Sequence, residues 1–327
     1  MDPALHTQRD IIVIGGSAGA IGALADIVGE LPADFPAALF VVIHIPANTA
    51  SVLPQILARR CGLSAGYPSD GDRIERGRIY VAPPDYHLVI GDGSIGVTRG
   101  PRENGHRPAI DPLFRSAARA HGPRVVGVIL SGNLDDGSAG LREVTLRGGI
   151  GIVQDPAEAL YPGMPRNALE RGNGHHALPI AQIGAFLARI VREPTTGVKI
   201  SSAESSMSEP VQTFDNPAAL ACPECDGALR EEGNGDHVHF RCHVGHAYSP
   251  ESLVAAESER LERAMWTALR CLEENAALAR RMATHAKQGR HFHSARRFEK
   301  RANNLEQELL VVREALEKLS PPPPAQE

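Results

Sequence analysis

Short apolar stretches alternate with longer amphipathic stretches between residue 10 and about residue 192. The apolar stretches are rich in Val and Ile and are bounded by Gly or Pro, which is typical of β-strands. Several are apolar on both faces, as expected of strands buried in a parallel sheet. The pattern predicts strands at residues 10–15, 38–43, 78–82, 124–130 and 150–154, and helices at residues 18–30, 51–61, 112–121, 138–147 and 180–192. From Tyr86, two alternating runs flank Asp92-Gly93 and predict a β-hairpin. Residues 1–192 are therefore predicted to form an α/β domain with a doubly wound, mainly parallel sheet.

The remainder of the chain shows different patterns. Residues 193–217 lack periodicity and are rich in Ser, Thr, Pro and Glu, so we expect a linker. Residues 218–250 contain a cysteine cluster, and residues 251–319 have apolar residues at spacings of four and three, which predicts a helical hairpin with a coiled-coil seam. The predicted seam positions are 261, 265, 268, 272, 275, 279 and 282, and, after a turn near Gly289, 298, 302, 305, 309, 312, 316 and 319. The proline-rich tail, residues 320–327, cannot continue the helix and is expected to be disordered.

Composition narrows the classes of protein to which the chain can belong. The formal net charge of −5 argues against nucleic-acid binding. No apolar run approaches the roughly 18 residues that a membrane-spanning helix needs, and the polar N-terminus does not resemble a signal peptide. Five cysteines, three of them within residues 222–242, indicate a metal site rather than a disulfide framework. We therefore expect a cytoplasmic protein with no nucleic-acid partner and no membrane insertion.

A turn of small residues, G-G-S-A-G, joins the first predicted strand to the first predicted helix and carries Ser17. A dinucleotide-binding turn would need the pattern G-x-G-x-x-G, which fails from either starting glycine, and no Walker lysine follows. The pattern G-x-S-x-G fits directly, and it holds a nucleophilic serine on a sharp strand-to-helix turn. The N-terminus of the following helix offers N–H groups that can stabilise an oxyanion. A serine that only caps the helix is equally compatible with this stretch.

Further candidates follow two other predicted strands. His44 lies where strand 38–43 ends, and Asp135 and Asp136 lie in a glycine-bounded loop after strand 124–130. The carboxyl ends of parallel strands form the edge at which open α/β sheets bind ligands. A nucleophilic serine needs a base, and the base needs a carboxylate that orients it. Taken singly, a buried histidine and an Asp-Gly turn are common structural features, but their occurrence at one edge favours a catalytic arrangement.

Residues 10 to about 192 resemble the catalytic domain of the chemotaxis protein-glutamate methylesterases of the CheB type. The matching motifs are I-G-G-S-A-G-A, H-I-P-A-N-T, G-H-R-P-A-I-D-P-L-F, G-V-I-L-S-G-N-L-D-D-G and P-G-M-P-R-N-A, in the family's order. The resemblance implies a triad in which Ser17 is the nucleophile, His44 the general base and Asp136 the orienting carboxylate, with no cofactor for catalysis. It also implies hydrolysis of glutamyl methyl esters on the cytoplasmic domains of chemoreceptors, releasing methanol, and deamidation of glutamine by the same route.

The sequence departs from the family pattern in several respects. Ala18 follows the predicted nucleophile where threonine is frequent, and Gly132-Asn133 opens a loop that often reads G-M-G. Well-known members carry an N-terminal receiver domain, whereas this chain begins almost at the catalytic domain, so we expect that mode of regulation to be absent in cis. These departures leave an alternative function, a catalytically weak regulatory or scaffold protein of a chemosensory signal-transduction pathway. Asp111 is interpreted as a structural cap of the helix that begins near Pro112.

The cysteine cluster has the spacing of a zinc site. Cys222 and Cys225 form a C-x-x-C knuckle, and Cys242 and His246 follow after sixteen residues. Three thiolates and one imidazole give tetrahedral Cys3His coordination. Because four protein ligands leave no open position, we predict a structural zinc in a zinc-ribbon-like module.

The sequence leaves two features of this part of the chain open. His237 and His239 are alternative fourth ligands, and His243 is a poorer one because it is adjacent to a cysteine ligand. The hairpin seam is expected to serve the hairpin's own packing, but an exposed seam would let it self-associate or dock a receptor or adaptor.

Overall fold

The computed structural model describes residues 8–46, 51–172, 174–195, 220–233 and 238–319. The chain divides into two compact units, one that ends at Leu253 and one that begins at Val254. Most of the predicted linker and all of the predicted disordered tail lie outside the described residues. No helix in the described part of the chain is long and apolar enough to cross a membrane.

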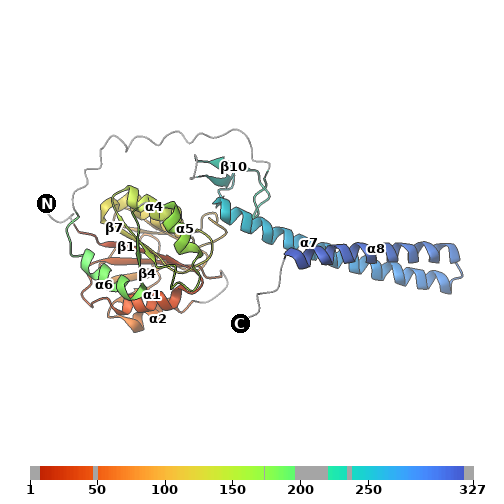
Figure 1. Cartoon of the computed structure of the whole chain (residues 1–327), viewed down its shortest axis with the longest axis horizontal. Coiled ribbons are helices and arrows are strands. Elements are labelled where there is room, and N and C mark those ends of the chain that lie inside the picture. Colours follow the sequence, from red (N-terminus) through yellow and green to blue (C-terminus); the bar gives the residue numbers. More distant parts are fainter. Residues whose placement is uncertain (1–7, 47–50, 173, 196–219, 234–237, 320–327) are drawn as a thin grey trace. The chain divides into compact units, whose positions relative to one another are not determined.

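Seven strands form one sheet in the order β3-β4-β2-β1-β7-β8-β9, and every neighbouring pair is parallel (Figure 1). The strands are β1 (Ile11–Gly16), β2 (Ala38–Ile43), β3 (Ser64–Gly66), β4 (Arg78–Val81), β7 (Val125–Ile129), β8 (Ile150–Gln154) and β9 (His176–Leu178). The predicted parallel α/β class and all five predicted strands are confirmed. The two edge strands β3 and β9 escaped prediction because each has only three residues, too few for a periodic signal.

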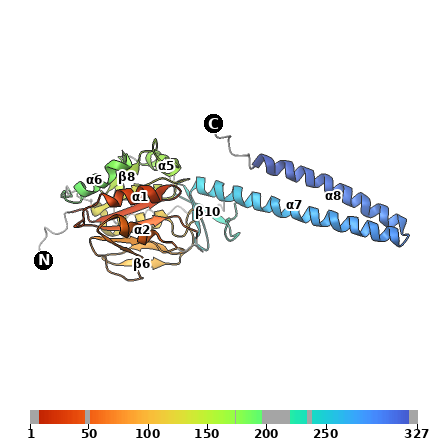
Figure 2. The same ribbon diagram turned by 90° about the horizontal axis from the view of Figure 1, so that it is seen from below.

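Helices cover both faces of the sheet, as Figures 1 and 2 show. One face packs against α1 (Ala20–Gly29), α2 (Leu53–Arg60) and α6 (Ile180–Ile190). The other packs against α3 (Ile110–His121), α4 (Ser138–Leu146), α5 (Gly163–Arg171) and the predicted hairpin, β5 (His87–Ile90) with β6 (Ile95–Thr98). Strand β1 serves both cores because Ile12 belongs to the first and Ile11 to the second. This two-sided burial is the reason that the strand reads as a continuous apolar run.

The order of the strands fixes where a site can form. Strand β1 lies between β2 and β7. Strands β2, β3 and β4, which precede β7 in the chain, extend to one side of β1, and β7, β8 and β9 extend to the other, so the strand order reverses at β1. A crevice forms outside the carboxyl ends of the strands at such a reversal. The loops that leave β1, β2 and β7 begin there, and they carry Ser17, His44 and Asp136.

A second, small sheet belongs to the same compact unit. It is antiparallel and consists of β10 (Leu229–Glu232), β11 (His239–Cys242) and β12 (Ala247–Tyr248). The chain just before α3 runs beside β12, because Ala247 N–H donates to Arg102 O (3.2 Å) and Asn104 N–H donates to Ala247 O (2.8 Å). The cysteine-containing segment is therefore joined to the α/β sheet domain by backbone hydrogen bonds.

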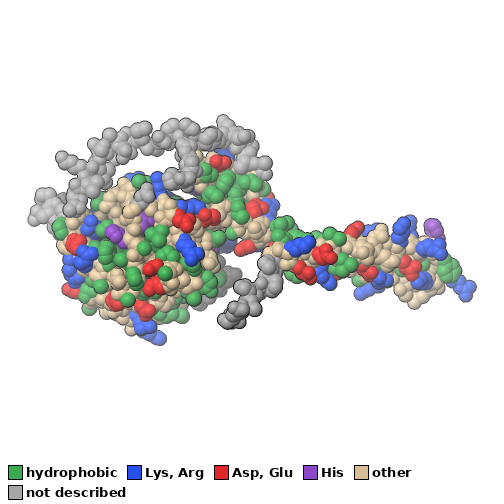
Figure 3. Space-filling model, viewed as in Figure 1, with side chains coloured by type: hydrophobic (Ala, Val, Ile, Leu, Met, Phe, Trp, Pro, Cys, Tyr) green, Lys and Arg blue, Asp and Glu red, His purple; other side chains and the backbone are tan. Residues whose placement is uncertain are grey.

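Two long helices follow, α7 (Pro250–Gln288) and α8 (Phe292–Leu319). From Val254 onward they form the second unit, an antiparallel hairpin in which Arg280 pairs with Glu306, Lys287 with Glu299 and Arg313 with Glu273. Figure 3 shows basic and acidic side chains interspersed along these helices. In α8 the predicted seam is confirmed from Phe298 to Leu316, with Ala302 and Leu316 buried, but its last position, Leu319, is 46% exposed.

In α7 the predicted seam is wrong at every second position. Leu269, Ala276 and Ala283 are buried, one residue beyond the predicted 268, 275 and 282. Predicted Leu261 is half exposed, at 50%. The error arose because apolar residues stand side by side at Ala268-Leu269 and Met282-Ala283, so spacing alone could not choose which of each pair is buried.

Candidate active site and metal site

Ser17 lies in a tightly held turn between β1 and α1. Its backbone N–H donates to Ser131 O (2.9 Å), and its carbonyl accepts from Ala20 N–H (3.2 Å). Ser131 Oγ in turn donates to Ala18 O (2.8 Å). Gly19 occupies the N-cap position of α1 with φ 76°, a left-handed conformation that glycine adopts without strain. The turn is thus fixed from one side by the helix and from the other by the loop that follows β7.

The loop after β7 needs a glycine to approach Ser17. A Cβ added to Gly132 would lie 2.9 Å from the Ser17 Cβ and 2.1 Å from the sulfur of Met164, a fully buried side chain at the start of α5. Any other residue at this position would push the turn and the methionine apart.

His44 lies beside Ser17 on the neighbouring strand. Gly16 and Ile43 are paired residues at the ends of β1 and β2, and His44 N–H donates to Gly16 O (3.2 Å). The next residue on each strand is therefore Ser17 and His44. Their side chains are not hydrogen-bonded to each other among the described contacts, and catalytic hydrogen bonds are often long before substrate binds.

Asp136 receives hydrogen bonds from three parts of the chain. His44 Nε2 lies 2.8 Å from Asp136 Oδ2. The N–H groups of Ile110 (2.7 Å, to Oδ2) and Asp111 (3.3 Å, to Oδ1) donate from the first turn of α3, and Asn104 Nδ2 donates to Oδ1 (3.0 Å). Burial by itself would raise the pKa of Asp136, but the hydrogen bond and charge of His44 and the N–H of Ile110 outweigh it, so the pKa lies well below its usual range. Asp136 is therefore a buried, ionised carboxylate.

Asp111 does not cap its own helix, contrary to the interpretation from sequence. Its Oδ1 accepts the Gly140 N–H (2.7 Å) in the first turn of α4, while Asp136, which precedes α4, serves the first turn of α3. Each helix therefore donates a first-turn N–H group to an aspartate at the start of the other helix. Burial and the charge of Asp136 raise the pKa of Asp111 to about 8, so this second carboxyl is protonated near neutral pH.

His106 is a site residue to which the sequence analysis gave no role. Its ring stacks on the ring of His44, with centroids 3.7 Å apart and an interplanar angle of 14°. Burial and the charge of His44 lower the pKa of His106 to about 4, so the stacked ring is neutral at pH 7. His106 lies in the motif G-H-R-P, but nothing in the neighbouring sequence indicates that it contacts a residue as distant in the chain as His44.

The four predicted metal ligands come together in the small sheet. His246 Nδ1 lies 3.6 Å from Cys222 Sγ and from Cys242 Sγ, and Cys225 Sγ lies 3.6 Å from Cys242 Sγ. All four ligand atoms lie within 4.8 Å of one another. Two sulfurs on one tetrahedral zinc would be about 3.8 Å apart, whereas a disulfide needs about 2.05 Å. The arrangement fits a Cys3His metal site.

Among the described residues, the alternative ligands His239 and His243 are not part of this cluster. His239 lies in β11 with its Nε2 3.3 Å from Glu232. His237 lies outside the described residues. The two turns that carry the ligands are closed by backbone bonds, from Asp226 N–H to Cys222 O (2.9 Å) and from Gly245 N–H to Cys242 O (3.0 Å).

Comparison with known proteins identifies the family. The model of the CheB methylesterase family matches residues 12–187. The chain belongs to the CheB methylesterase family. The match includes the turn at Ser17, His44, and the loop that carries Asp136, as the resemblance seen in the sequence implies.

Relatives of this CheB-family chain carry corresponding names. A protein-glutamate methylesterase/protein-glutamine glutaminase of Ralstonia nicotianae is 40% identical over 189 residues, 56% of this chain and 49% of the relative. One of Methanosarcina mazei is 34% identical over 192 residues, 56% of this chain and 52% of the relative. The chain thus spans about half the length of these curated relatives. A putative enzyme of the same name from Leptospira interrogans is 36% identical, and the match covers 55% of this chain and 94% of that protein.

A solved structure agrees with the family. The crystal structure of the Thermotoga maritima CheB methylesterase catalytic domain matches with a TM-score of 0.53 and 32% identity, over 56% of this chain and 98% of that chain.

Replacing Asp111 by Asn should change how stability depends on pH. The pKa of Asp111 is about 8 in the folded chain and about 3.9 in an unfolded one. Between these values only the unfolded chain releases the proton, so the wild type loses stability as the pH rises, by about 1.4 kcal/mol per pH unit at most. Urea unfolding at pH 5 to 8 should show Asp111→Asn gaining on the wild type as the pH rises. Asp26→Asn, at an exposed position on α1, is the control, and a pH-independent difference for Asp111→Asn would contradict the assignment.

Proposed function

We propose that this chain is a protein-glutamate methylesterase, which hydrolyses glutamyl methyl esters on the cytoplasmic domains of chemoreceptors and releases methanol. The observation that carries the proposal is the 2.8 Å contact between His44 Nε2 and a buried, ionised Asp136, next to the turn of Ser17. The names of the relatives support the same ester chemistry and add glutamine deamidation, which uses the same acyl-transfer route.

In the proposed mechanism, Ser17 is the nucleophile and His44 is the general base. Ser17 Oγ attacks the ester carbonyl carbon while His44 takes the hydroxyl proton through Nδ1, since Nε2 faces Asp136. The imidazolium then protonates the departing methoxide, which leaves as methanol. A water molecule, activated by the same base, hydrolyses the acyl-serine and restores a free glutamate carboxylate.

The turn limits which backbone groups can hold the oxyanion. The Ser17 N–H is already committed to Ser131 O. The N–H of Ala18 has no backbone acceptor among the described residues, and it is the group that follows the nucleophile in a strand-to-helix turn. We assign the oxyanion contact to Ala18 N–H, with the positive N-terminal end of α1 adding to it. Because a backbone N–H makes the oxyanion contact, the assignment is compatible with alanine at position 18, where threonine is frequent in the family.

Replacing Ser17 by Ala should abolish methanol release from methylated chemoreceptor fragments, because it removes the hydroxyl that attacks the ester carbonyl. The rate should fall at least about 10³-fold while the chain stays folded. Methanol release and the far-ultraviolet circular dichroism spectrum would be measured on the same preparations. Ser69→Ala, in an exposed loop, is the matched control and should be fully active.

Two outcomes would count against the proposal. Undiminished release by Ser17→Ala would remove the serine mechanism. Absence of release by the folded wild type with several receptors would favour the alternative, a regulatory or scaffold role in a chemosensory pathway.

We further propose that the Cys3His site binds zinc and that residues 218–250 form a zinc-ribbon-like module. Thiolates and an imidazole in tetrahedral arrangement are the ligands that zinc prefers, and three sulfurs disfavour magnesium or calcium. Four protein ligands leave no position for substrate, so the ion would stabilise the fold of the module and would contact no reacting atom.

Elemental analysis should find one zinc per chain. Cys242→Ser should lose it, because the thiolate is a ligand, whereas Cys271→Ser should keep it, because Cys271 is exposed on α7. A chelator should unfold the module and leave the helical circular dichroism signal of the α/β part in place. Equal zinc content in the two variants would refute the ligand assignment.

A further inference from the structure

Asn104 links the candidate active site to the segment that follows the metal ligands. Its amide nitrogen donates to Asp136 Oδ1 (3.0 Å) and to Asp111 Oδ2 (3.3 Å). Its amide oxygen accepts the backbone N–H of Ser249 (2.9 Å), and its own N–H donates to Ala247 O (2.8 Å). The side chain is 8% exposed and its φ is 52°, a left-handed conformation that asparagine tolerates better than most residues.

A second link runs through Asp135, the residue before Asp136. Its Oδ1 accepts hydrogen bonds from the hydroxyls of Ser249 (2.7 Å) and Ser252 (3.0 Å), and Arg171 Nη1 lies 2.9 Å from Oδ2. Asp135 is 2% exposed, so loss of the two hydroxyls would leave a buried carboxyl with one partner. Residues 247–252 therefore contact Asp135 directly and hold Asp136 through Asn104.

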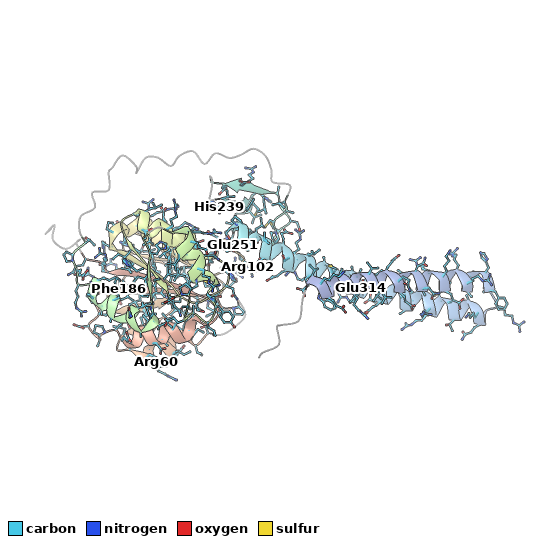
Figure 4. The ribbon with its side chains drawn as sticks, in the orientation of Figure 1. Arg60, Arg102, Phe186, His239, Glu251 and Glu314 are labelled. Carbon is cyan, nitrogen blue, oxygen red and sulfur yellow. The ribbon has the colours of Figure 1, made fainter. Side chains whose placement is uncertain are left out.

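The position of that segment is set by the metal site. Ala247 follows the ligand His246 directly, and Cys242 N–H donates to His246 O (3.0 Å). Ala247 pairs with Arg241 between β12 and β11, and a Cβ on Gly245 would lie 2.9 Å from the ring of Pro101. An ion pair from Arg102, labelled in Figure 4, to Glu224 (3.0 Å) joins the same two parts of the chain.

We propose that the Cys3His module is a built-in positioning element of the esterase. With its metal bound, it holds residues 247–252, which hold Asn104 and Asp135 and thereby keep Asp136 in place for His44. When the metal is lost, Asn104 loses both partners on the module side, and the loop of residues 131–137 relaxes. Asn104 is a positioning residue and touches no reacting atom. The inference rests on the proposed function for its meaning, but its test does not use a chemoreceptor.

The test measures how fast Ser17 reacts with a small dialkyl fluorophosphate. The serine oxygen forms a bond to phosphorus, fluoride leaves, and the transferred proton goes to His44, so the rate reports the assembled triad without a receptor substrate. The full chain would be compared zinc-loaded, chelated, and reloaded with zinc. The maximal labelling rate constant should fall about tenfold or more on chelation and return on reloading, with half-saturation by the reagent little changed.

Variants separate positioning from general stability. Asn104→Ala should show the same loss of the maximal rate constant while it still binds zinc. If that variant fails to fold, Ser249→Ala combined with Ser252→Ala tests the Asp135 link in the same way. Arg230→Gln changes an exposed side chain of β10 that takes no part in these contacts, and it should label at the wild-type rate. Hydrogen exchange over residues 131–137 should become faster in the chelated chain, a readout that does not depend on activity.

The outcomes are distinct for the two proposals. Zinc-dependent labelling of Ser17 without methanol release from any receptor would support this inference and overturn the proposed function. Methanol release and labelling that are unchanged by chelation, or by Asn104→Ala in a folded chain, would overturn the inference and leave the proposed function standing.

Discussion

A carboxylate can stay ionised in the interior only if several donors surround it, and Asp136 meets this condition at the start of a helix. Its donors are backbone N–H groups of Ile110 and Asp111, the ring of His44 and the amide of Asn104. They come from three separate stretches of the chain. Removing one partner of a buried charge is far more costly than the pair is worth, so this single carboxylate constrains where α3, the end of β2 and the loop before α3 must lie.

The need for surrounding donors also explains why two neighbouring buried carboxyl groups differ in charge. Asp136 is ionised because its donors and His44 compensate for burial, whereas Asp111 stays protonated because burial and the adjacent negative charge both oppose its ionisation. Exchange of the two side chains between α3 and α4 requires these helices to approach closely. Gly140 permits it, because a Cβ there would lie 2.6 Å from that of Phe114. In this CheB-family domain, the close packing of α3 against α4 and the charges of the two carboxyl groups therefore depend on each other.

Much of this arrangement follows from the sequence, and the rest depends on contacts between distant residues. The apolar runs located the strands, and the positions of His44 and Asp136 after strands placed them at one edge. The spacing of Cys222, Cys225, Cys242 and His246 predicted four metal ligands, and the structure brings these four side chains together. Asp135 was a candidate from its place after a strand, but neither its contact with Ser249 nor that of Asn104 could be predicted, because Ser249 lies 114 and 145 positions away. The seam of α7 was misplaced for a different reason, since adjacent apolar residues such as Ala268 and Leu269 leave its register ambiguous by one residue.

The most direct test of this account is the turnover number of Asp136→Asn for methanol release, measured on zinc-loaded chain with the fold checked by circular dichroism. The amide keeps the shape of the side chain but removes the charge that orients and stabilises the protonated ring of His44. We predict a fall of about 10³-fold or more in kcat with the chain still folded. A folded Asp136→Asn chain with nearly wild-type kcat would contradict the central role of this carboxylate.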